Sequence, residues 1–290
     1  MTKGKTMLKK NLVILTRPSN KSFQEKIKEA AAEKSLNVFI IYPENIDLPL
    51  DLHLKNHQQH LPIPESCLFW NRISGTTYND YDRLITASWQ QMGATLLNCP
   101  NVHHLYRDKF RQYLHLKNAG LPVLNTYYLP NKNTKNIPHE GPFVAKTLRG
   151  AKGKGVIKLI DKMALEDFLT LTESMGDTRF IIQDFVSYEQ EHRLLVCGGE
   201  IIRHLIKTSS GGHWKHNLNN SKWSVALETP EEMINIVKKV DALEKKFFYA
   251  VDLIYKNNDL YLLEVNICPG VDGPDELSEK SILHEVLGII

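Results

Sequence analysis

A lysine at the end of an apolar stretch precedes a glycine-rich segment near the middle of the chain. Residues 142–146 read Pro-Phe-Val-Ala-Lys, and residues 149–156 read Arg-Gly-Ala-Lys-Gly-Lys-Gly-Val. The glycines are Gly150, Gly153 and Gly155. They allow a tight turn that directs backbone N–H groups at phosphate oxygens, and Lys146 adds a compact positive charge. The spacing is not that of a P-loop. It predicts a phosphate-binding loop between two strands, with a purely structural turn as the alternative.

Acidic and amide side chains interrupt two apolar stretches in the C-terminal part of the chain. Residues 251–255 and 260–266 predict two strands joined by a turn. Asp252, Glu264 and Asn266 would then project from adjacent strands, and Glu264 and Asn266 would share one face because they are two residues apart. Such oxygen ligands suit Mg²⁺. The alternative is that they are solvent-facing positions of amphipathic strands.

Between these two regions, residues 180–186 form an extended apolar segment that leads toward Glu191. This arrangement suits an adenosine pocket in which backbone groups contact the base and Glu191 accepts hydrogen bonds from ribose hydroxyls. Arg193, Arg203 and Lys207 alternate with apolar residues on the strands that follow. They could line a cleft where phosphate charge develops, although single basic residues on strands are more often surface charges.

The elements that would position these residues begin with a parallel sheet. Residues 12–16, 22–34 and 38–42 read as strand, helix and strand, and a long proline-containing connection precedes another strand at 67–70. The connections between such parallel strands leave the loops at the strand ends available for ligands. The connection also carries three histidines at helix-like spacing, to which we assign no function because no carboxylate or cysteine completes a metal site. They are His53, His57 and His60.

Further along, a helix is expected at 78–92, a short strand at 95–97 and an amphipathic helix at 108–118 that ends before Gly120. Residues 100–122 therefore bridge an N-terminal lobe to the rest of the chain. The fold class is α/β.

The composition excludes several functional classes. The 290 residues are 42% hydrophobic, and 36 Lys and Arg face 33 Asp and Glu. A net charge of +3 gives no reason to expect nucleic acid or a membrane as a partner. The cysteines are widely spaced and are expected to be reduced thiols: Cys67, Cys99, Cys197 and Cys268. The apolar run at 12–15 is too short for a signal peptide or a membrane span, so a cytoplasmic protein is expected.

Several ordered segments together resemble the ATP-grasp superfamily, and within it the RimK-like group of glutamate and amino-acid ligases. These segments are ILTRPSN (14–20), NRISGTTY (71–78), RDKFRQYLHLKNAGLPV (107–123), FVAKTLRGAKGKGV (143–156), EHRLLVCGGEIIRHLIK (191–207) and LLEVNICPGVDG (262–273). The resemblance implies an N-terminal pre-ATP-grasp domain over 11–100, a central lobe with the glycine-rich loop over 101–187, and a C-terminal lobe with the magnesium ligands over 188–290. The two lobes would grip ATP between antiparallel sheets.

The resemblance also implies roles for individual residues. Those that match nucleotide-binding positions are Lys109, Lys146, Gly150, Gly153, Gly155, Gln183, Asp184, Phe185, Val186 and Glu191. Those that match catalytic positions are Arg193, Lys207 and Asn217. Those that match metal ligands are Asp252, Glu264 and Asn266. The implied reaction is an ATP-dependent ligation of a carboxylate to an amine through an acyl phosphate, with Mg²⁺ or Mn²⁺ as the ion and an amino acid, peptide or protein tail as a substrate.

The sequence departs from the family pattern where substrates are chosen. The family segment has an Arg followed by Ser or Thr and then Asn, whereas residues 214–217 read Trp-Lys-His-Asn here. Residues 218–223 stand where a glycine-rich stretch is expected. The amine acceptor therefore stays open, and so does the oligomeric state, with a homo-oligomer as one option. Arg72, at a strand end, is a candidate for binding a substrate carboxylate, and a structural turn residue is the alternative.

Two other functions are compatible with this set of residues. A phosphotransferase on the same fold would release a stable phosphorylated product and would not depend on an amine. A non-catalytic ATP-binding module would leave ATP intact, and the full set of lysines and acidic ligands argues against it.

Overall fold

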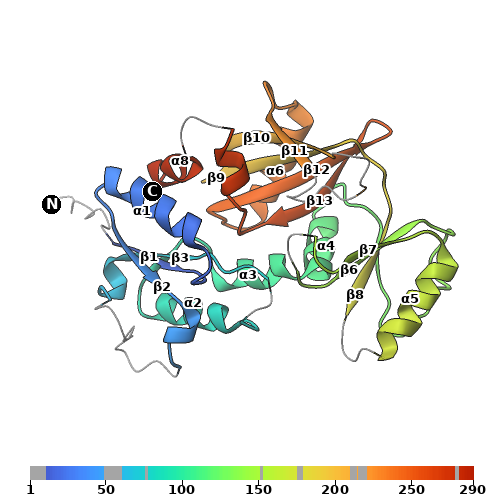
Figure 1. Cartoon of the computed structure of the whole chain (residues 1–290), viewed down its shortest axis with the longest axis horizontal. Helices are drawn as coiled ribbons and strands as arrows, with labels where there is room; N and C mark the ends of the chain where they lie inside the picture. Colours follow the sequence, from blue (N-terminus) through green and yellow to red (C-terminus); the bar gives the residue numbers. More distant parts are fainter. Residues whose placement is uncertain are drawn as a thin grey trace.

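The computed structural model shows three sheets arranged along an elongated molecule, with the N-terminal sheet at one end and the smallest lobe at the other (Figure 1). The structure describes residues 11–48, 61–75, 78–150, 153–174, 179–209, 214, 221–277 and 281–290. The predictions for His53, His57, His60 and Asn217 fall outside these described residues.

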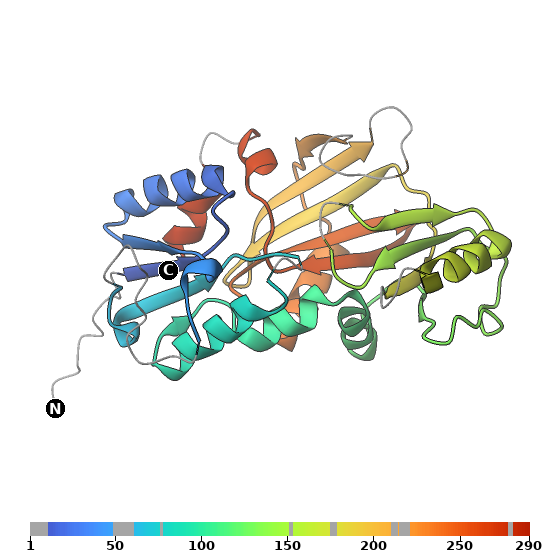
Figure 2. The same ribbon diagram turned by 60° about the horizontal axis from the view of Figure 1, so that its bottom comes forward.

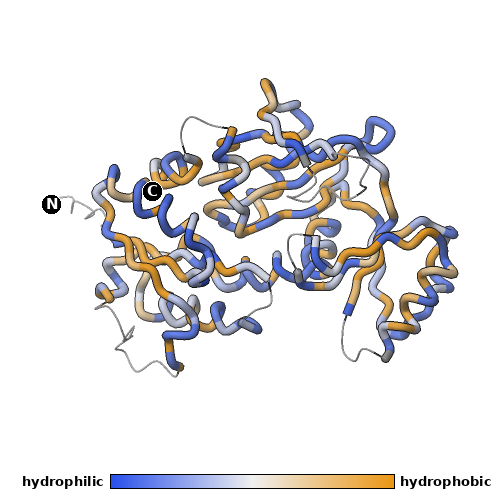
Figure 3. The backbone as a smooth tube through the Cα atoms, in the orientation of Figure 1, coloured by the Kyte–Doolittle hydropathy of each residue, from blue (hydrophilic) through white to orange (hydrophobic). Residues whose placement is uncertain are grey.

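The N-terminal sheet is parallel throughout, as predicted. Its strands, in spatial order, are β2 (Asn37–Ile41), β1 (Asn11–Leu15), β3 (Cys67–Asn71) and β4 (Thr95–Leu96). These strands are largely hydrophobic along their length (Figure 3), as expected for a parallel sheet that is covered on both faces.

Helices cover the two faces of this sheet. Helix α1 (Lys21–Glu33) packs on one face beside α8 (Ile282–Gly288), so the end of the chain returns to the N-terminal domain. Helix α2 (Tyr81–Gln91) packs on the other face. Helix α2 begins later than the predicted Tyr78 because Asn79 and Asp80 adopt left-handed backbone angles, with φ of 44° and 69°.

Two consecutive helices connect this domain to the lobes that follow. They are α3 (Pro100–Arg107) and α4 (Lys109–Asn118), which Figure 2 shows running along the edge of the large sheet. Asp108 separates them and caps α4, because its Oδ1 accepts hydrogen bonds from the backbone N–H groups of Phe110 and Arg111. The Gln112 side chain bonds both the N–H and the C=O of Val265, which fixes α4 on strand β13 (Asp259–Asn266).

The small sheet is antiparallel and carries the glycine-rich segment between two of its strands, as predicted. Its strands, in spatial order, are β5 (Thr126–Tyr128), β8 (Phe180–Asp184), β6 (Phe143–Thr147) and β7 (Val156–Leu159). Helix α5 (Lys162–Ser174) packs on this sheet through Leu165 and Leu169, which gives the lobe its own core.

The large sheet is also antiparallel. Its strands, in spatial order, are β11 (Ser221–Val225), β10 (Glu200–Ser209), β9 (Gln190–Cys197), β12 (Phe248–Lys256) and β13. Helix α6 (Glu231–Leu243) packs on one face, and the other face meets the N-terminal domain through Leu195 and Phe248. A short helix, α7 (Asp272–Asp275), follows β13. The predicted β12–β13 hairpin is confirmed, and its register shifts between Asp252 and Leu253.

Candidate active site

A pocket lies where the small sheet faces the large one. Its lining comes from α4, from both sheets and from the segment after α4: Lys109, Gln112, Tyr113, Leu116, Val123, Lys146, Ile181, Gln183, Leu262, Leu263 and Glu264. Both lobes contribute a predicted site residue, Lys146 from β6 and Glu264 from β13. Charged and amide side chains are interspersed with aliphatic ones along its walls, so the pocket offers fixed polar groups beside apolar surface, as a small-molecule site requires.

Lys146 is held in this pocket by a neutral partner. Its Nζ donates to Oε1 of Gln183 over 2.7 Å, and Gln183 in turn donates to the Thr126 hydroxyl over 3.0 Å. Burial lowers the pKa of Lys146 to about 8, with the Lys109 charge adding to the effect and Glu264 and Glu191 opposing it. Because an amide does not neutralise an ammonium, the cation is available to an incoming anion.

The glycine-rich turn is fixed at its base. Gly155 has a φ of 70°, and a Cβ at this position would lie 2.6 Å from Thr147 Oγ1, so only glycine fits without a shift. The Thr147 hydroxyl donates to the Arg149 carbonyl over 2.9 Å. Lys109 Nζ donates to the Gly150 carbonyl over 3.2 Å, and both predicted nucleotide-binding lysines, Lys109 and Lys146, line the pocket. Gly153 also has a φ of 70°.

The predicted adenine-reading segment, residues 183–186, comprises the last two residues of β8 and the two that follow it. The Asp184 carboxylate is engaged outside the pocket, since it lies 2.8 Å from His139 Nε2 and accepts from Asn125 over 2.9 Å. The Phe185 N–H donates to the Pro142 carbonyl over 3.0 Å, and Val186 is buried. A lysine that the sequence reading missed, Lys158 on β7, places its Nζ 3.8 Å from the centre of the Phe185 ring.

Two ion pairs on the large sheet bring together the predicted catalytic and acidic residues. Arg193 donates through Nε and Nη2 to the two oxygens of Asp252, both over 2.6 Å, and Lys207 pairs with Glu191. Burial alone would raise the pKa of Asp252, but the Arg193 and Lys207 cations hold it below its ordinary value. Burial and the nearby Asp252 charge raise the pKa of Glu191 despite Lys207. These side chains form one buried, paired cluster.

An aromatic ring that the sequence reading did not assign completes this cluster. The Trp223 ring centre lies 5.7 Å from the Arg193 guanidinium and 5.1 Å from Lys207 Nζ. Trp223 occupies the stretch that departs from the family pattern, and the departure itself was the available signal. Of the two interpretations given for Arg203, a cleft residue or a charge elsewhere on the strand, the second holds, because Arg203 does not join the cluster. It shares a face of β10 with Lys207 but lies about 13 Å further along the strand, where it pairs with Glu285 on α8.

The predicted metal ligands lie on adjacent strands. Asp252 is directly opposite Glu264 in the β12–β13 ladder, and Asn266 lies two residues beyond. The Asn266 Oδ1 accepts from the Cys268 N–H over 2.9 Å, which orients the amide. Within the described part of the chain, no three His, Cys, Asp or Glu side chains form a metal cluster. Two carboxylates and an amide nevertheless fit Mg²⁺, which usually takes one or two carboxylates and completes its shell with phosphate oxygens and water.

Arg72 lies outside the residues that line the pocket. Its guanidinium is enclosed by aromatic rings, 4.9 Å from the centre of Trp70 and 5.1 Å from that of Phe23, and its Nη2 donates to the Pro269 carbonyl over 2.6 Å. The residue is 8% exposed. It therefore joins the N-terminal sheet to the segment after β13, and substrate binding by Arg72 stays a prediction.

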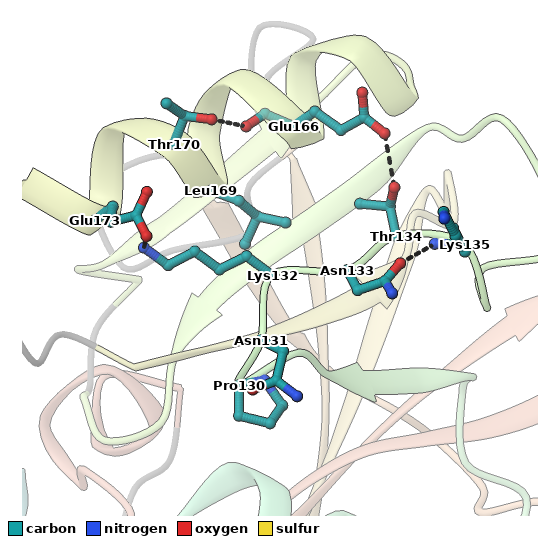
Figure 4. Close-up of a pocket in the computed structure, with 10 residues that line it drawn as sticks. All are labelled: Pro130, Asn131, Lys132, Asn133, Thr134, Lys135, Glu166, Leu169, Thr170 and Glu173. Carbon is teal, nitrogen blue, oxygen red and sulfur yellow. Dashed lines mark hydrogen bonds and ion pairs between the residues drawn. The ribbon is translucent and has the colours of Figure 1, made fainter.

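A second hollow, of about 410 Å³, lies between residues 130–135 and helix α5 (Figure 4). Three of its charged groups are engaged with one another or with a hydroxyl. Lys132 Nζ lies 3.5 Å from the Glu173 carboxylate, and the Thr134 hydroxyl donates to Glu166 over 2.6 Å. It shares no lining residue with the pocket between the sheets and contains none of the predicted site residues.

Comparison with known proteins defines the class. The probable alpha-L-glutamate ligase of Alkalilimnicola ehrlichii is 25% identical over 288 residues, which cover 97% of this chain and 95% of that protein. The RimK domain ATP-grasp protein from Sphaerobacter thermophilus superposes with a TM-score of 0.66 at 15% identity, covering 92% of this chain and 94% of that one. For D-alanine–D-alanine ligase from Bacillus anthracis complexed with ATP, the TM-score is 0.67 at 15% identity, with coverage of 96% and 91%.

The fold is thus that of the ATP-grasp enzymes, which confirms the predicted fold. The family profile described as the RimK-like ATP-grasp domain matches residues 106–290, and the chain belongs to this family. The predicted reaction class is confirmed as well: the protein is an ATP-dependent, ADP-forming ligase that joins a carboxylate to an amine. Among the helices that the structure describes, none is long and apolar enough to span a membrane.

Proposed function

We propose that the protein activates a substrate carboxylate with ATP and Mg²⁺, or Mn²⁺ in its place, and joins it to the amine of an amino acid, peptide or protein tail. The observation that carries this proposal is a pocket to which both lobes contribute. Lys146 and Gln183 come from the small sheet, and Leu262 and Glu264 come from the large one. A nucleotide bound there would contact both lobes at once.

The nucleotide would be held by residues on three sides of the pocket. Lys109 and Lys146 would bind its phosphates, and the turn from Gly150 to Gly155 would close over them. Residues 183–186 would contact the adenine and Glu191 the ribose. For Glu191 this requires partial release from Lys207, with which its carboxylate is paired.

The ligands for the ion would be Asp252, Glu264 and Asn266, and the ion supplies neutralisation of phosphate charge when bound. The substrate carboxylate attacks the γ-phosphorus, the bond to ADP breaks, and an acyl phosphate forms. The amine then attacks the acyl carbon, loses a proton and displaces phosphate. Arg193 and Lys207 would stabilise the spreading charge, with Asn217 as a further proposed catalytic residue. Closure of the turn excludes water, which would otherwise hydrolyse the acyl phosphate.

Glutamate is the first carboxylate or amine substrate to test, because relatives that align with nearly the whole chain are named probable alpha-L-glutamate ligases. We further propose a cytoplasmic location and leave a homo-oligomer as an option. Arg72 would take part in substrate binding only if its aromatic enclosure opens.

The test is ADP release with MgATP across a panel of amino acids and acidic peptides, followed by mass spectrometry of the mixtures. A substrate-dependent ADP signal together with the mass of a new amide is the expected result. A stable phosphorylated product formed without an amine would instead indicate a phosphotransferase. Intact ATP in every mixture would contradict the proposal.

A further inference from the structure

The Gln112 side chain on helix α4 takes the place of a neighbouring strand at the outer edge of β13. This strand is the last in the large sheet, so its second edge has no strand to pair with. At Val265, the Gln112 Oε1 accepts from the backbone N–H over 2.9 Å, and the Nε2 donates to the carbonyl over 3.0 Å. One side chain therefore makes the two hydrogen bonds that an adjacent strand would make at this residue.

The place of this contact along the strand is what gives it a role in the site. Val265 lies between Glu264 and Asn266, two of the residues proposed to hold the ion. The N–H of Val265 belongs to the peptide group that joins it to Glu264, and its carbonyl belongs to the peptide group that joins it to Asn266. Gln112 thus fixes both peptide planes between these two side chains, and the direction of each side chain depends on those planes.

The strand is irregular directly before this contact. In the ladder with β12, Asp252 is opposite Glu264 and Leu253 is opposite Leu262. Leu263 therefore has no opposite residue, and the strand bulges there. A bulge disrupts the ladder and bends the strand, and it is a common means of redirecting a side chain. The contact from α4 holds the strand at its other edge just past the bulge.

Gln112 is itself held firmly. Its side chain is buried, and its Nε2 also donates to the Tyr106 carbonyl over 2.9 Å. Its backbone lies in the first turns of α4, which Asp108 caps. A buried amide whose hydrogen bonds all go to backbone groups leaves those groups little freedom. The side chain therefore connects a fixed helix to the edge of β13.

The same helix carries one of the lysines that line the pocket. Lys109 lies three residues before Gln112, so the two side chains share a face of α4, and both line the pocket. One capped helix thereby provides a lysine assigned to the nucleotide and the contact that holds the strand of the proposed metal ligands.

We propose that Gln112 is a positioning residue for the metal site. Through the backbone of Val265 it fixes the directions of Glu264 and Asn266 and sets their place relative to Lys109. The inference rests on the proposed function, because the metal role of these two side chains is assigned there. Gln112 acts through the strand and contacts neither the ion nor the nucleotide.

Calorimetry of a non-hydrolysable ATP analogue, titrated with and without Mg²⁺, tests this role. Gln112→Met keeps the length of the side chain and removes both hydrogen bonds to Val265. We expect the Mg²⁺ concentration at half-saturation, measured with the analogue bound, to rise about tenfold, the lower end of the loss when a group that supports metal ligands is removed. Affinity for the analogue without Mg²⁺ should stay at the wild-type value, a split that a general loss of structure would not produce.

Lys246→Met is the matched control. Lys246 is buried, and its Nζ donates to the carbonyls of Val240 and Glu244, both over 2.7 Å, so this variant also removes two hydrogen bonds from a side chain to the backbone. Both carbonyls lie at the end of α6 and not on β13. Its urea midpoint should fall while its Mg²⁺ half-saturation matches the wild type.

A second variant covers the case in which Gln112→Met does not fold. Gln112→Asn keeps the amide on a stem that is one carbon shorter, so both hydrogen bonds are strained but a polar group remains. Its Mg²⁺ half-saturation should lie between those of the wild type and Gln112→Met. A wild-type value in every folded Gln112 variant would overturn the inference. An equal loss of analogue affinity with and without Mg²⁺ would also overturn it, because Gln112 would then contact the nucleotide directly.

Asn266→Ala separates this inference from the proposed function, because it removes one proposed ligand directly. If Asn266→Ala raises the Mg²⁺ half-saturation and the Gln112 variants do not, only the inference fails. If Asn266→Ala leaves it unchanged, the proposed ligand set fails and the inference fails with it. In the double variant Gln112→Met/Asn266→Ala the rise should be smaller than the product of the two single rises, because both changes act on the same ligand. Rises that multiply would show that Gln112 acts independently of Asn266 and would overturn the inference.

Discussion

The two sheets that form the pocket hold their positive charges in different ways. On the large sheet, Arg193 and Lys207 each pair with a carboxylate on a neighbouring strand and lie against Trp223. On the small lobe, Lys146 has a neutral amide as its partner, and Arg149 pairs with a residue of another domain. One set of cations is therefore neutralised within its own sheet, and the other is not.

We therefore expect the cations of the two sheets to have different roles. The cations of the large sheet are fixed by the strand ladder before nucleotide arrives, so they can stabilise developing charge without reorganisation. The cations of the small lobe would give up only an amide or a partly exposed carboxylate if phosphate binds there as proposed. In the proposed function, the large sheet is then the rigid side of the pocket, where the chemistry takes place, and the small lobe is the adjustable side, where the nucleotide is bound.

The largest effect that the comparison predicts comes from the rigid side. Glu264→Gln keeps the size of the side chain and removes its charge from the proposed metal set. We expect ATP turnover to fall on the order of a thousandfold, the several kcal/mol that a catalytic metal site contributes. Steady-state ADP release measures the loss, and the urea midpoint should stay unchanged.

The control for this variant is Asp259→Asn, which removes an exposed carboxylate at the start of the same strand. Its turnover should match the wild type. If Glu264→Gln keeps magnesium-dependent turnover within a few-fold of the wild type, the metal assignment on the rigid side is wrong.

The next effect concerns stability. Arg193→Met leaves the buried Asp252 carboxylate without its partner, and we expect the free energy of unfolding to fall by about 3 kcal/mol in urea titrations. Arg149→Gln should cost less than about 1 kcal/mol, because its ion pair is partly exposed. Equal losses in the two variants would contradict the proposed contrast between the sheets.

The double variant Arg193→Met/Asp252→Leu sharpens this test. It removes both charges, so most of the stability lost in Arg193→Met should return. A further loss would show that Asp252 stabilises the fold through contacts other than Arg193.

Local patterns predicted the parts of the site that are close together in the sequence. The β6–turn–β7 unit with Lys146 and the β12–β13 hairpin with Glu264 each follow from alternating residues and a turn, and both are present. Burying a polar group in an apolar strand costs free energy, so the presence of such groups in these strands also predicted a function for them.

Contacts between distant segments could not be predicted in this way. The Arg193–Asp252 pair depends on the register between β9 and β12, and Arg203 shares a face with Lys207 yet lies too far along the strand to join it. The residues at the start of α2 likewise did not predict that the Asp80 side chain pairs with Arg149 and makes no cap hydrogen bond to its own helix. Packing between elements determines which of these side chains meet, and the periodicity within one element does not show it.

The smallest predicted effect tests the adjustable side through pH. Lys146 has a pKa lowered to about 8 by burial, and phosphate should bind its protonated form. Nucleotide affinity is therefore expected to be constant below pH 7 and to fall as pH rises above about 8, by at most about tenfold per unit for one proton.

Calorimetry of a magnesium complex of a non-hydrolysable ATP analogue between pH 7 and 9.5 measures this slope, and proton uptake on binding should appear near pH 8.5. Lys146→Arg is the matched control. Arginine stays charged throughout this range, so its slope should vanish even if its affinity is lower. A slope that persists in Lys146→Arg would assign the titration to another group. A flat wild-type profile would mean that Lys146 keeps its proton throughout this range, so that its pKa is not lowered by burial beside the neutral Gln183.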